Sequence, residues 1–190
     1  MHEVKFDQVI QDYLTGKDLQ MTTYEDIRQA LARILVEEKG YPVQNIKPRY
    51  KLPLGLDDID YTINLDFLVT IDEQPAMILG FCPGAVSTYI TQYVSAARIF
   101  PGGPVPFVLV TDSTDAALVR VKDKKEICRG YHCIPTWQHL QEIFKECPPC
   151  TFTTERQLKE KRVAHAMFAL SDGYCSSSCE ITSDKSQADS

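Results

Sequence analysis

Residues 60–82 read DYTINLDFLVTIDEQPAMILGFC and contain two strand signals separated by an acidic turn. In the first half, apolar side chains alternate with other residues, and this period of two is typical of a strand. The alternating positions, which we predict to share one face, are Tyr61, Ile63, Leu65, Phe67, Val69 and Ile71. Asp72 and Glu73 mark the turn, and the short apolar run 76–82 is typical of a buried strand. The stretch therefore predicts two strands that pair as a meander.

The rest of the chain predicts helices and strands in an order that defines the fold class. Helical spacing of apolar residues or helix start and stop signals mark five segments, which are 5–15, 22–40, 85–100, 136–146 and 154–170. Further strands are predicted at 46–54, 105–111 and 116–121, the first at a sheet edge because it contains Pro48 and Pro53. A meander followed by a helical crossover indicates an α/β protein with a mixed central sheet flanked by helices, here with additional helices at both ends.

The composition is that of an ordinary globular domain. The chain has 190 residues, 44% of them hydrophobic and 24% charged, which suits one core. We expect an α/β domain over residues 1–146, a helical extension with cysteines over 147–170 and a flexible tail over 171–190. The formal net charge of −6 weighs against tight nonspecific DNA binding, which needs clustered Lys and Arg. No apolar run is long enough to span a bilayer and the N-terminus is polar, so we expect a cytoplasmic protein without a membrane partner.

The seven cysteines suggest metal binding more than disulfides, because the number is odd and no secretory signal is seen. Two spaced pairs could supply four thiolates to Zn²⁺ or an iron–sulfur cluster, namely Cys147 with Cys150 and Cys175 with Cys179. The stiff proline spacer of the first pair and the serine-rich second pair argue against that site. The other cysteines are interpreted as small buried apolar side chains, and they are Cys82, Cys128 and Cys133. His132 has no partner that the sequence reveals.

Several short motifs between residues 12 and 121 carry a family resemblance. They are Tyr13-Leu14-Thr15-Gly16-Lys17, Tyr24-Glu25-Asp26-Ile27-Arg28-Gln29, Lys39-Gly40-Tyr41-Pro42, Leu65-Asp66-Phe67-Leu68-Val69 and Thr91-Gln92-Tyr93-Val94-Ser95-Ala96-Ala97-Arg98. In this order and spacing they resemble the N-terminal nuclease domain of type I restriction enzyme R subunits, and especially its compact bacterial versions. That domain belongs to the restriction-endonuclease-like, PD-(D/E)xK class of nucleases.

The resemblance implies a Mg²⁺-dependent deoxyribonuclease site, in which a metal-activated water cuts the phosphodiester. Asp66 matches the family aspartate and would be the Mg²⁺ ligand, Glu25 matches the helix glutamate and Gln92 matches the glutamine that follows. The Glu-x-Lys pair of the next strand is missing, because Gly80 and Cys82 stand in its place. Glycine offers no ligand, and a thiol is a poor ligand for Mg²⁺.

Three functional hypotheses follow. The first is a nuclease-like domain that binds DNA or a protein partner without cutting, and the second is an active endonuclease or exonuclease with a rearranged site. The third is a metal-dependent or redox-dependent interaction protein that uses its C-terminal cysteines. For Glu25 a structural role is equally consistent, because Thr22-x-x-Glu25 is a capping box at a helix start. For Asp66 a site role is favoured, because a carboxylate within an apolar strand is costly unless it is paired.

Overall fold

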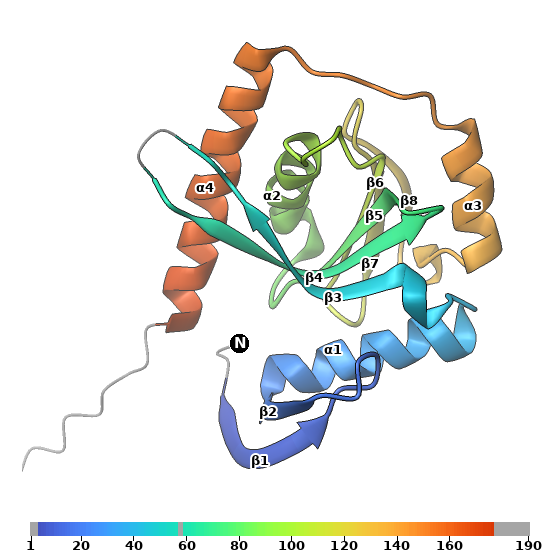
Figure 1. Ribbon diagram of the computed structural model, residues 1–190, viewed down its shortest axis with the longest axis vertical. Helices are drawn as coiled ribbons and strands as arrows, with labels where there is room; N and C mark the ends of the chain where they lie inside the picture. Colours follow the sequence, from blue (N-terminus) through green and yellow to red (C-terminus); the bar gives the residue numbers. More distant parts are fainter. Residues whose placement is uncertain (1–3, 57–58, 177–190) are drawn as a thin grey trace, which may run out of the picture.

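A six-stranded sheet lies between two layers of helices (Figure 1). The computed structural model describes residues 4–56 and 59–176, and for residues 172–176 it describes the backbone alone. The strand order is β3-β4-β5-β6-β7-β8, and all neighbours are antiparallel except β5 and β6, which are parallel. Helix α2 makes the crossover between these two parallel strands, as the geometry of parallel pairing requires. The predicted α/β class with a mixed, helix-flanked sheet is confirmed.

The elements have the following bounds. The sheet contains β3 (Ile46–Pro53), β4 (Thr62–Ile71), β5 (Gln74–Phe81), β6 (Phe107–Thr111), β7 (Ala116–Arg120) and β8 (Lys125–Arg129). The longer helices are α1 (Thr23–Arg33), which continues as the π-helical η1 (Ile34–Glu38), α2 (Val86–Arg98), α3 (Trp137–Glu146) and α4 (Thr154–Ser176). Two 3-10 turns, η2 (Val43–Asn45) and η3 (Tyr131–Cys133), complete the connections. A separate hairpin of β1 (Lys5–Gln11) and β2 (Asp18–Thr22) lies beside α1 in Figure 1.

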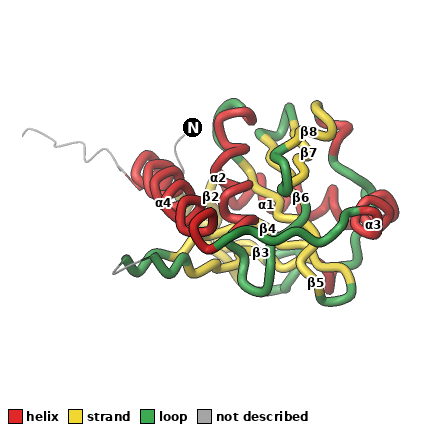
Figure 2. The backbone as a smooth tube through the Cα atoms, turned by 90° about the horizontal axis from the view of Figure 1, so that it is seen from above, coloured by secondary structure: helices red, strands yellow, loops and turns green. Residues whose placement is uncertain are grey.

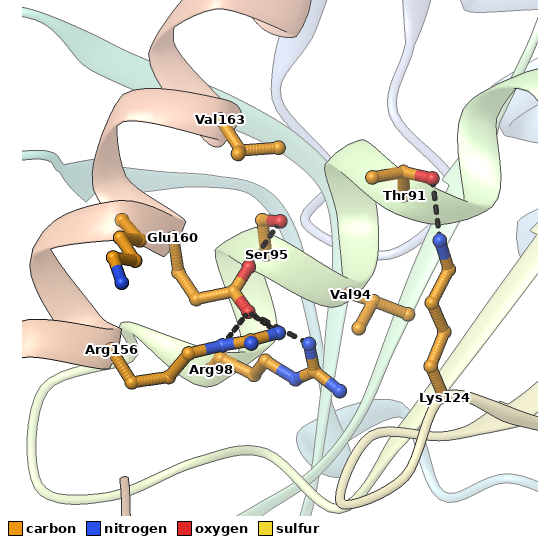
Figure 3. Close-up of a pocket in the computed structure, with 9 residues that line it drawn as sticks. Thr91, Val94, Ser95, Arg98, Lys124, Arg156, Glu160 and Val163 are labelled. Atoms are coloured by element: carbon orange, nitrogen blue, oxygen red, sulfur yellow. Dashed lines mark hydrogen bonds and ion pairs between the residues drawn. The ribbon is translucent and has the colours of Figure 1, made fainter. Parts of the chain in front are cut away.

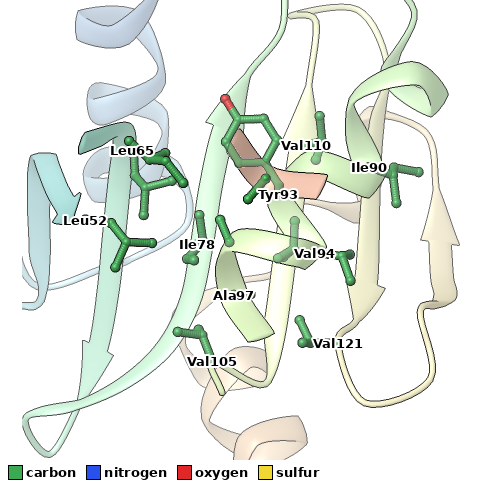
Figure 4. Packing of buried hydrophobic residues seen from close by; sticks show 14 of the residues in the cluster. Leu52, Leu65, Ile78, Ile90, Tyr93, Val94, Ala97, Val105, Val110 and Val121 are labelled. Carbon is green, nitrogen blue, oxygen red and sulfur yellow. The ribbon is translucent and has the colours of Figure 1, made fainter. Parts of the chain in front are cut away.

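Two apolar clusters fill the spaces between the layers. On one face, α2 and α4 cover the sheet, and Figure 4 shows Tyr93 and Val94 of α2 packed near Ile78 of β5. On the other face, α1 and α3 contribute Leu31 and Leu140 to a second cluster. β5 and β6 lie in the middle of the sheet and are buried on both faces, as the uninterrupted apolar run in each predicts.

At Asp66, the apolar side chains of strand β4 change from one face of the sheet to the other. Leu65 belongs to the cluster under α2, whereas Phe67 belongs to the cluster under α1. The prediction of a single face for all the alternating positions is therefore wrong. The pairs Pro48–Phe67 and Tyr50–Leu65 place Asp66 opposite Arg49, whose φ of 50° is rare for a residue other than glycine. The two irregular positions face each other across the β3–β4 ladder.

Two local predictions are wrong at the secondary-structure level. Residues 5–15 were expected to form a helix, but they form β1 and the turn that leads to β2. Asp12 closes that turn by accepting the backbone N–H of Thr15, and Gly16 follows with a φ of 68°. Strand β8 was not predicted, and three of its five residues are charged, namely Lys125, Glu126 and Arg129. Helix α4 begins after Thr153, whose hydroxyl caps the Arg156 N–H, and it continues beyond the expected end at residue 170.

A buried ion pair attaches α4 to α2 (Figure 3). Glu160 is 4% exposed and accepts from Arg98 Nη1 at 2.7 Å and from Ser95 Oγ at 2.6 Å. Arg156 Nε adds a third donor at 2.7 Å. Burial alone would raise the pKa of Glu160, but these three donors together lower it.

None of the helices in the described part of the chain combines the length and the apolarity that a bilayer crossing needs.

Candidate functional site

Asp66 lies in the middle of β4 with 7% exposure and is held by donors from three elements. Its Oδ2 accepts from the Phe81 backbone N–H of β5 at 2.8 Å and from the Tyr93 hydroxyl of α2 at 3.4 Å. Its Oδ1 accepts from Arg28 Nε of α1 at 2.6 Å. A carboxylate with this set of donors can be buried without an unsatisfied oxygen. The strand that ends at Phe81 therefore lies beside Asp66, as the predicted register requires.

Glu25 lies in the first turn of α1, in the helical layer next to the sheet that contains Asp66, and it is 5% exposed. The N-cap bond of the predicted capping box is present, because the Thr22 hydroxyl accepts the Glu25 N–H at 2.9 Å. The Glu25 carboxylate accepts from Arg49 Nη1 at 2.9 Å and from Gln29 Nε2 at 2.8 Å. Arg28 Nη1 lies 3.3 Å from its other oxygen, so one guanidinium joins Glu25 and Asp66. The structure thus brings the two predicted acidic residues into one cluster.

Asp12 is a third buried carboxylate in this cluster, with 2% exposure, and no sequence pattern predicted it as a site residue. It pairs with Arg49 Nη2 and accepts from Gln29 Nε2 at 2.9 Å. Burial alone would raise the pKa of Asp12, but Arg49, Thr15 and Gln29 outweigh it and lower the pKa to about 2. The left-handed backbone at Arg49 costs on the order of 1 kcal/mol, and the two ion pairs of its side chain oppose that cost.

Two arginines offset most of the negative charge of this cluster. Asp12, Glu25 and Asp66 contribute three negative charges, while Arg28 and Arg49 contribute two positive ones. A guanidinium at 2.6 Å from an Asp66 oxygen takes the place that a divalent cation needs, and its charge repels a cation. Among the described residues, one group of three His, Cys, Asp or Glu side chains brings its ligand atoms within 4.8 Å of one another. That group lies elsewhere in the fold. These residues do not fit a Mg²⁺ ion.

Gly80 occupies the position of the expected second carboxylate, and a side chain there is excluded by Tyr93. Phe67 pairs with Leu79, so Gly80 lies opposite Asp66 in the β4–β5 ladder. A Cβ on Gly80 would lie 2.5 Å from the Tyr93 hydroxyl oxygen and closer still to two ring carbons. The Tyr93 hydroxyl also lies 3.2 Å from the Phe81 carbonyl oxygen, so its single proton can go to either this oxygen or Asp66 Oδ2. The tyrosine ring therefore fills the space that a glutamate would use.

Cys82 stands where the family lysine is expected, and its thiol is held in an apolar interior. The side chain is buried, and its Sγ lies 3.3 Å from the Gly84 carbonyl oxygen. Burial raises the pKa of the Cys82 thiol to about 12, so it stays protonated and neutral near pH 7. It can neither supply the positive charge of a lysine nor act as a thiolate.

Gln92 does not lie with the carboxylates. It is 4% exposed on α2, and its Oε1 accepts from the Ser171 hydroxyl of α4 at 3.3 Å. Its neighbour Tyr93 reaches Asp66 instead. Sequence reasoning missed Asp12, Arg28, Arg49 and Tyr93. Two of these lie in the quoted motifs, because Arg28 is one helical turn after Glu25 and Tyr93 directly follows Gln92. Spacing alone could have suggested Arg28 as the partner of Glu25.

The cysteines are arranged differently from the prediction. Cys128 and Cys133 form a disulfide, so their interpretation as separate buried apolar side chains is wrong, and the preference for metal binding over disulfides fails at this pair. Cys147 and Cys150 are partly buried in the connection between α3 and α4, whereas residue 175 lies near the far end of α4. Figures 1 and 2 show α3 and the end of α4 on opposite sides of the molecule. A helix rises about 1.5 Å per residue, so α4 keeps residue 175 well away from Cys150. Residue 179 lies outside the described residues.

Fold and site together define a mixed α/β domain in which the first long helix and a central strand bring acidic side chains together. This architecture agrees with the comparison of the sequence with known families. The chain belongs to the family of the type I restriction enzyme R protein N terminus, whose sequence model matches residues 23–135. The matched segment runs from the start of α1 to the second residue after η3 and contains Glu25, Asp66, Gly80 and Cys82. Comparison with curated proteins and with solved structures gives no match.

Proposed function

We propose that this protein is a nuclease-like domain that binds its partner without cutting DNA. One observation carries the proposal, namely that the Tyr93 ring fills the space of a side chain at position 80. Metal-dependent cleavage in a site of this kind needs at least two oxygen ligands and a cation that activates water. Among the described residues, Asp66 and Glu25 are the carboxylates that match the family pattern, and both accept from Arg28; the two oxygens of Asp66 also accept from Phe81 and Tyr93.

The arginines give the former site a structural role. Arg28 joins α1 to β4 through Glu25 and Asp66, and Arg49 joins β3 to the turn after β1 through Asp12. Removing one member of such a buried pair leaves an uncompensated charge, which is strongly destabilising. The carboxylates of the cluster therefore hold the N-terminal hairpin, the first helix and the sheet together.

DNA is the first partner to test, because the chain belongs to a restriction-enzyme family. The net charge of −6 predicts that such binding is weak and local, with few phosphate contacts and a small dependence on salt. If DNA does not bind, the same proposal leaves a protein as the partner. The acidic balance of the chain is compatible with either.

The test combines cleavage and binding on the same samples. Supercoiled plasmid and labelled single-stranded and double-stranded oligonucleotides are incubated with the protein and Mg²⁺ or Mn²⁺, beside the matched variant Asp66→Asn. We expect no cleavage above background for either protein, and fluorescence anisotropy then measures whether the oligonucleotides bind. Metal-dependent cleavage by the native protein that disappears in Asp66→Asn contradicts the proposal and favours an active enzyme with a rearranged site.

A further inference from the structure

The end of β8 and the turn that follows bring two sulfur atoms and one imidazole nitrogen close together. Cys128 is the fourth residue of β8, while His132 and Cys133 lie in η3, directly after Gly130. His132 Nε2 lies 3.7 Å from Cys128 Sγ and 3.7 Å from Cys133 Sγ. All three atoms lie within 4.8 Å of one another, and the functional site described above uses none of them.

The two sulfur-to-nitrogen separations match two edges of a zinc tetrahedron, whereas the disulfide holds the two sulfurs closer together than zinc requires. Zinc lies about 2.3 Å from thiolate sulfur and about 2.0 Å from imidazole nitrogen, so a tetrahedral angle places sulfur and nitrogen roughly 3.5 Å apart. Both sulfur-to-nitrogen distances in the turn are 3.7 Å, close to that value. Two thiolates and a neutral imidazole also balance the charge of Zn²⁺. The sulfurs themselves must separate to roughly 3.8 Å, which requires the thiol form.

The backbone of the turn positions the imidazole over the sulfurs. Gly130 has a φ of 106°, and a Cβ there would lie 2.9 Å from His132 Cε1 and Nδ1. The Gly130 N–H donates to the Ala116 carbonyl of β7 at 2.8 Å, and the Cys133 N–H donates to the Gly130 carbonyl at 2.9 Å. Glycine at this position therefore allows the ring to fold back, while the two hydrogen bonds fix the turn to the sheet.

The surroundings leave one side of the trio open. Cys133 is buried and Cys128 is partly buried, but His132 is exposed. Arg129, the nearest cation along the chain, is engaged with Asp115 at 2.7 Å and with Glu126 at 3.2 Å. Three protein ligands with one open position are the arrangement of zinc sites that keep a water or an exogenous ligand as the fourth.

We propose that Cys128, His132 and Cys133 form an open, three-ligand zinc site in the thiol form of the protein. The disulfide and the metal exclude each other, because the same sulfurs make either the sulfur–sulfur bond or the two bonds to zinc. A phosphine reductant opens the disulfide: phosphorus takes the oxygen of one water, and the two hydrogens of that water go to the two sulfurs. Binding of Zn²⁺ then releases those two protons.

The experiment uses the full chain with the other candidate thiols removed. In this four-serine background the substitutions are Cys147→Ser, Cys150→Ser, Cys175→Ser and Cys179→Ser. The protein is reduced with a phosphine without oxygen, freed of reductant and titrated with Zn²⁺ against a chromogenic chelator. Co²⁺ serves as the spectroscopic substitute, because its absorption reports tetrahedral geometry and thiolate ligands. Circular dichroism confirms that each sample is folded.

We expect one bound zinc in the reduced four-serine protein and none after the disulfide is closed again. Because His132 is exposed, His132→Ala should leave the fold intact and weaken zinc binding at least about tenfold, the lower end of what even a supporting group contributes to metal sites. His139→Ala, another exposed histidine, is the matched control and should leave affinity unchanged. A disulfide that the phosphine cannot open, a folded thiol form that binds no zinc, or an affinity that His132→Ala does not change would each overturn the proposal.

Discussion

Replacing Gly80 by alanine tests whether the Tyr93 ring fills the space of a side chain at position 80. The new Cβ would lie 2.5 Å from the Tyr93 hydroxyl oxygen and nearer to the ring, which is itself buried and packed against Phe168. Overpacking of this kind costs about 3 kcal/mol at its upper end. The smaller backbone entropy of alanine in the unfolded chain returns roughly 0.5–1 kcal/mol. We therefore expect Gly80→Ala to lower the free energy of unfolding by about 2 kcal/mol, an order-of-magnitude value from these two opposing effects.

Urea denaturation followed by circular dichroism measures this loss, and a double-mutant cycle assigns it to the ring. Tyr93→Ala alone should cost roughly 3–5 kcal/mol through the lost ring contacts. In the Tyr93→Ala background the overpacking is removed, so Gly80→Ala should instead raise the free energy of unfolding by roughly 0.5–1 kcal/mol, which gives a coupling energy of about 3 kcal/mol. Gly84→Ala is the matched control, because its Cβ meets Tyr89 only at 3.6 Å, an ordinary contact. Equal effects of the two glycine substitutions, or no coupling to Tyr93, would refute the reasoning.

Three further predictions concern groups outside that contact. Because its pKa is lowered to about 2 in the folded protein, Asp12 stabilises the fold above its unfolded pKa near 3.8, and this contribution is lost as the pH falls toward 2. The stability difference between the native protein and Asp12→Asn should accordingly shrink from roughly 2 kcal/mol at about pH 6 to near zero at about pH 2, measured by urea titration at each pH. Glu160→Gln should lower stability by about 3 kcal/mol because Arg98 keeps a buried charge, whereas Glu155→Gln, on an exposed pair, should change it by less than about 0.5 kcal/mol. Iodoacetamide should modify Cys147 long before Cys82, which mass spectrometry of native digests measures, and equal rates would contradict the buried, protonated state of Cys82.

The central strands were predictable because their signals are local. Alternation in 60–71 and the apolar run in 76–82 each specify a strand without reference to the rest of the chain. The hairpin of β1 and β2 was not predictable from its apolar spacing, because Phe6, Val9 and Ile10 fit one face of a helix as well. Phe6 and Val9 are exposed in the structure, so burial did not decide their conformation. The turn at Asp12 and Gly16 was the better signal.

The site was only half predictable, because its partners are distant in the sequence. Scarcity of buried aspartate singled out Asp66, and the family pattern located the missing Glu-x-Lys pair. The reason for the glycine, however, lies on another element, since Tyr93 reaches Gly80 only after α2 has crossed over the sheet. Arg49 likewise depends on the β3–β4 register and on an unusual backbone angle. Pairings of this kind follow from topology and cannot be derived from composition or periodicity.

Titration with Mn²⁺ tests most directly whether arginine has replaced the metal at Asp66. Mn²⁺ prefers the same oxygen ligands as Mg²⁺, and its electron paramagnetic resonance signal reports how much of the ion stays free. Because Arg28 lies 2.6 Å from Asp66 Oδ1, we predict that the native protein and Asp66→Asn leave the same fraction of Mn²⁺ free at every concentration. One Mn²⁺ bound by the native protein and lost in Asp66→Asn would contradict this account.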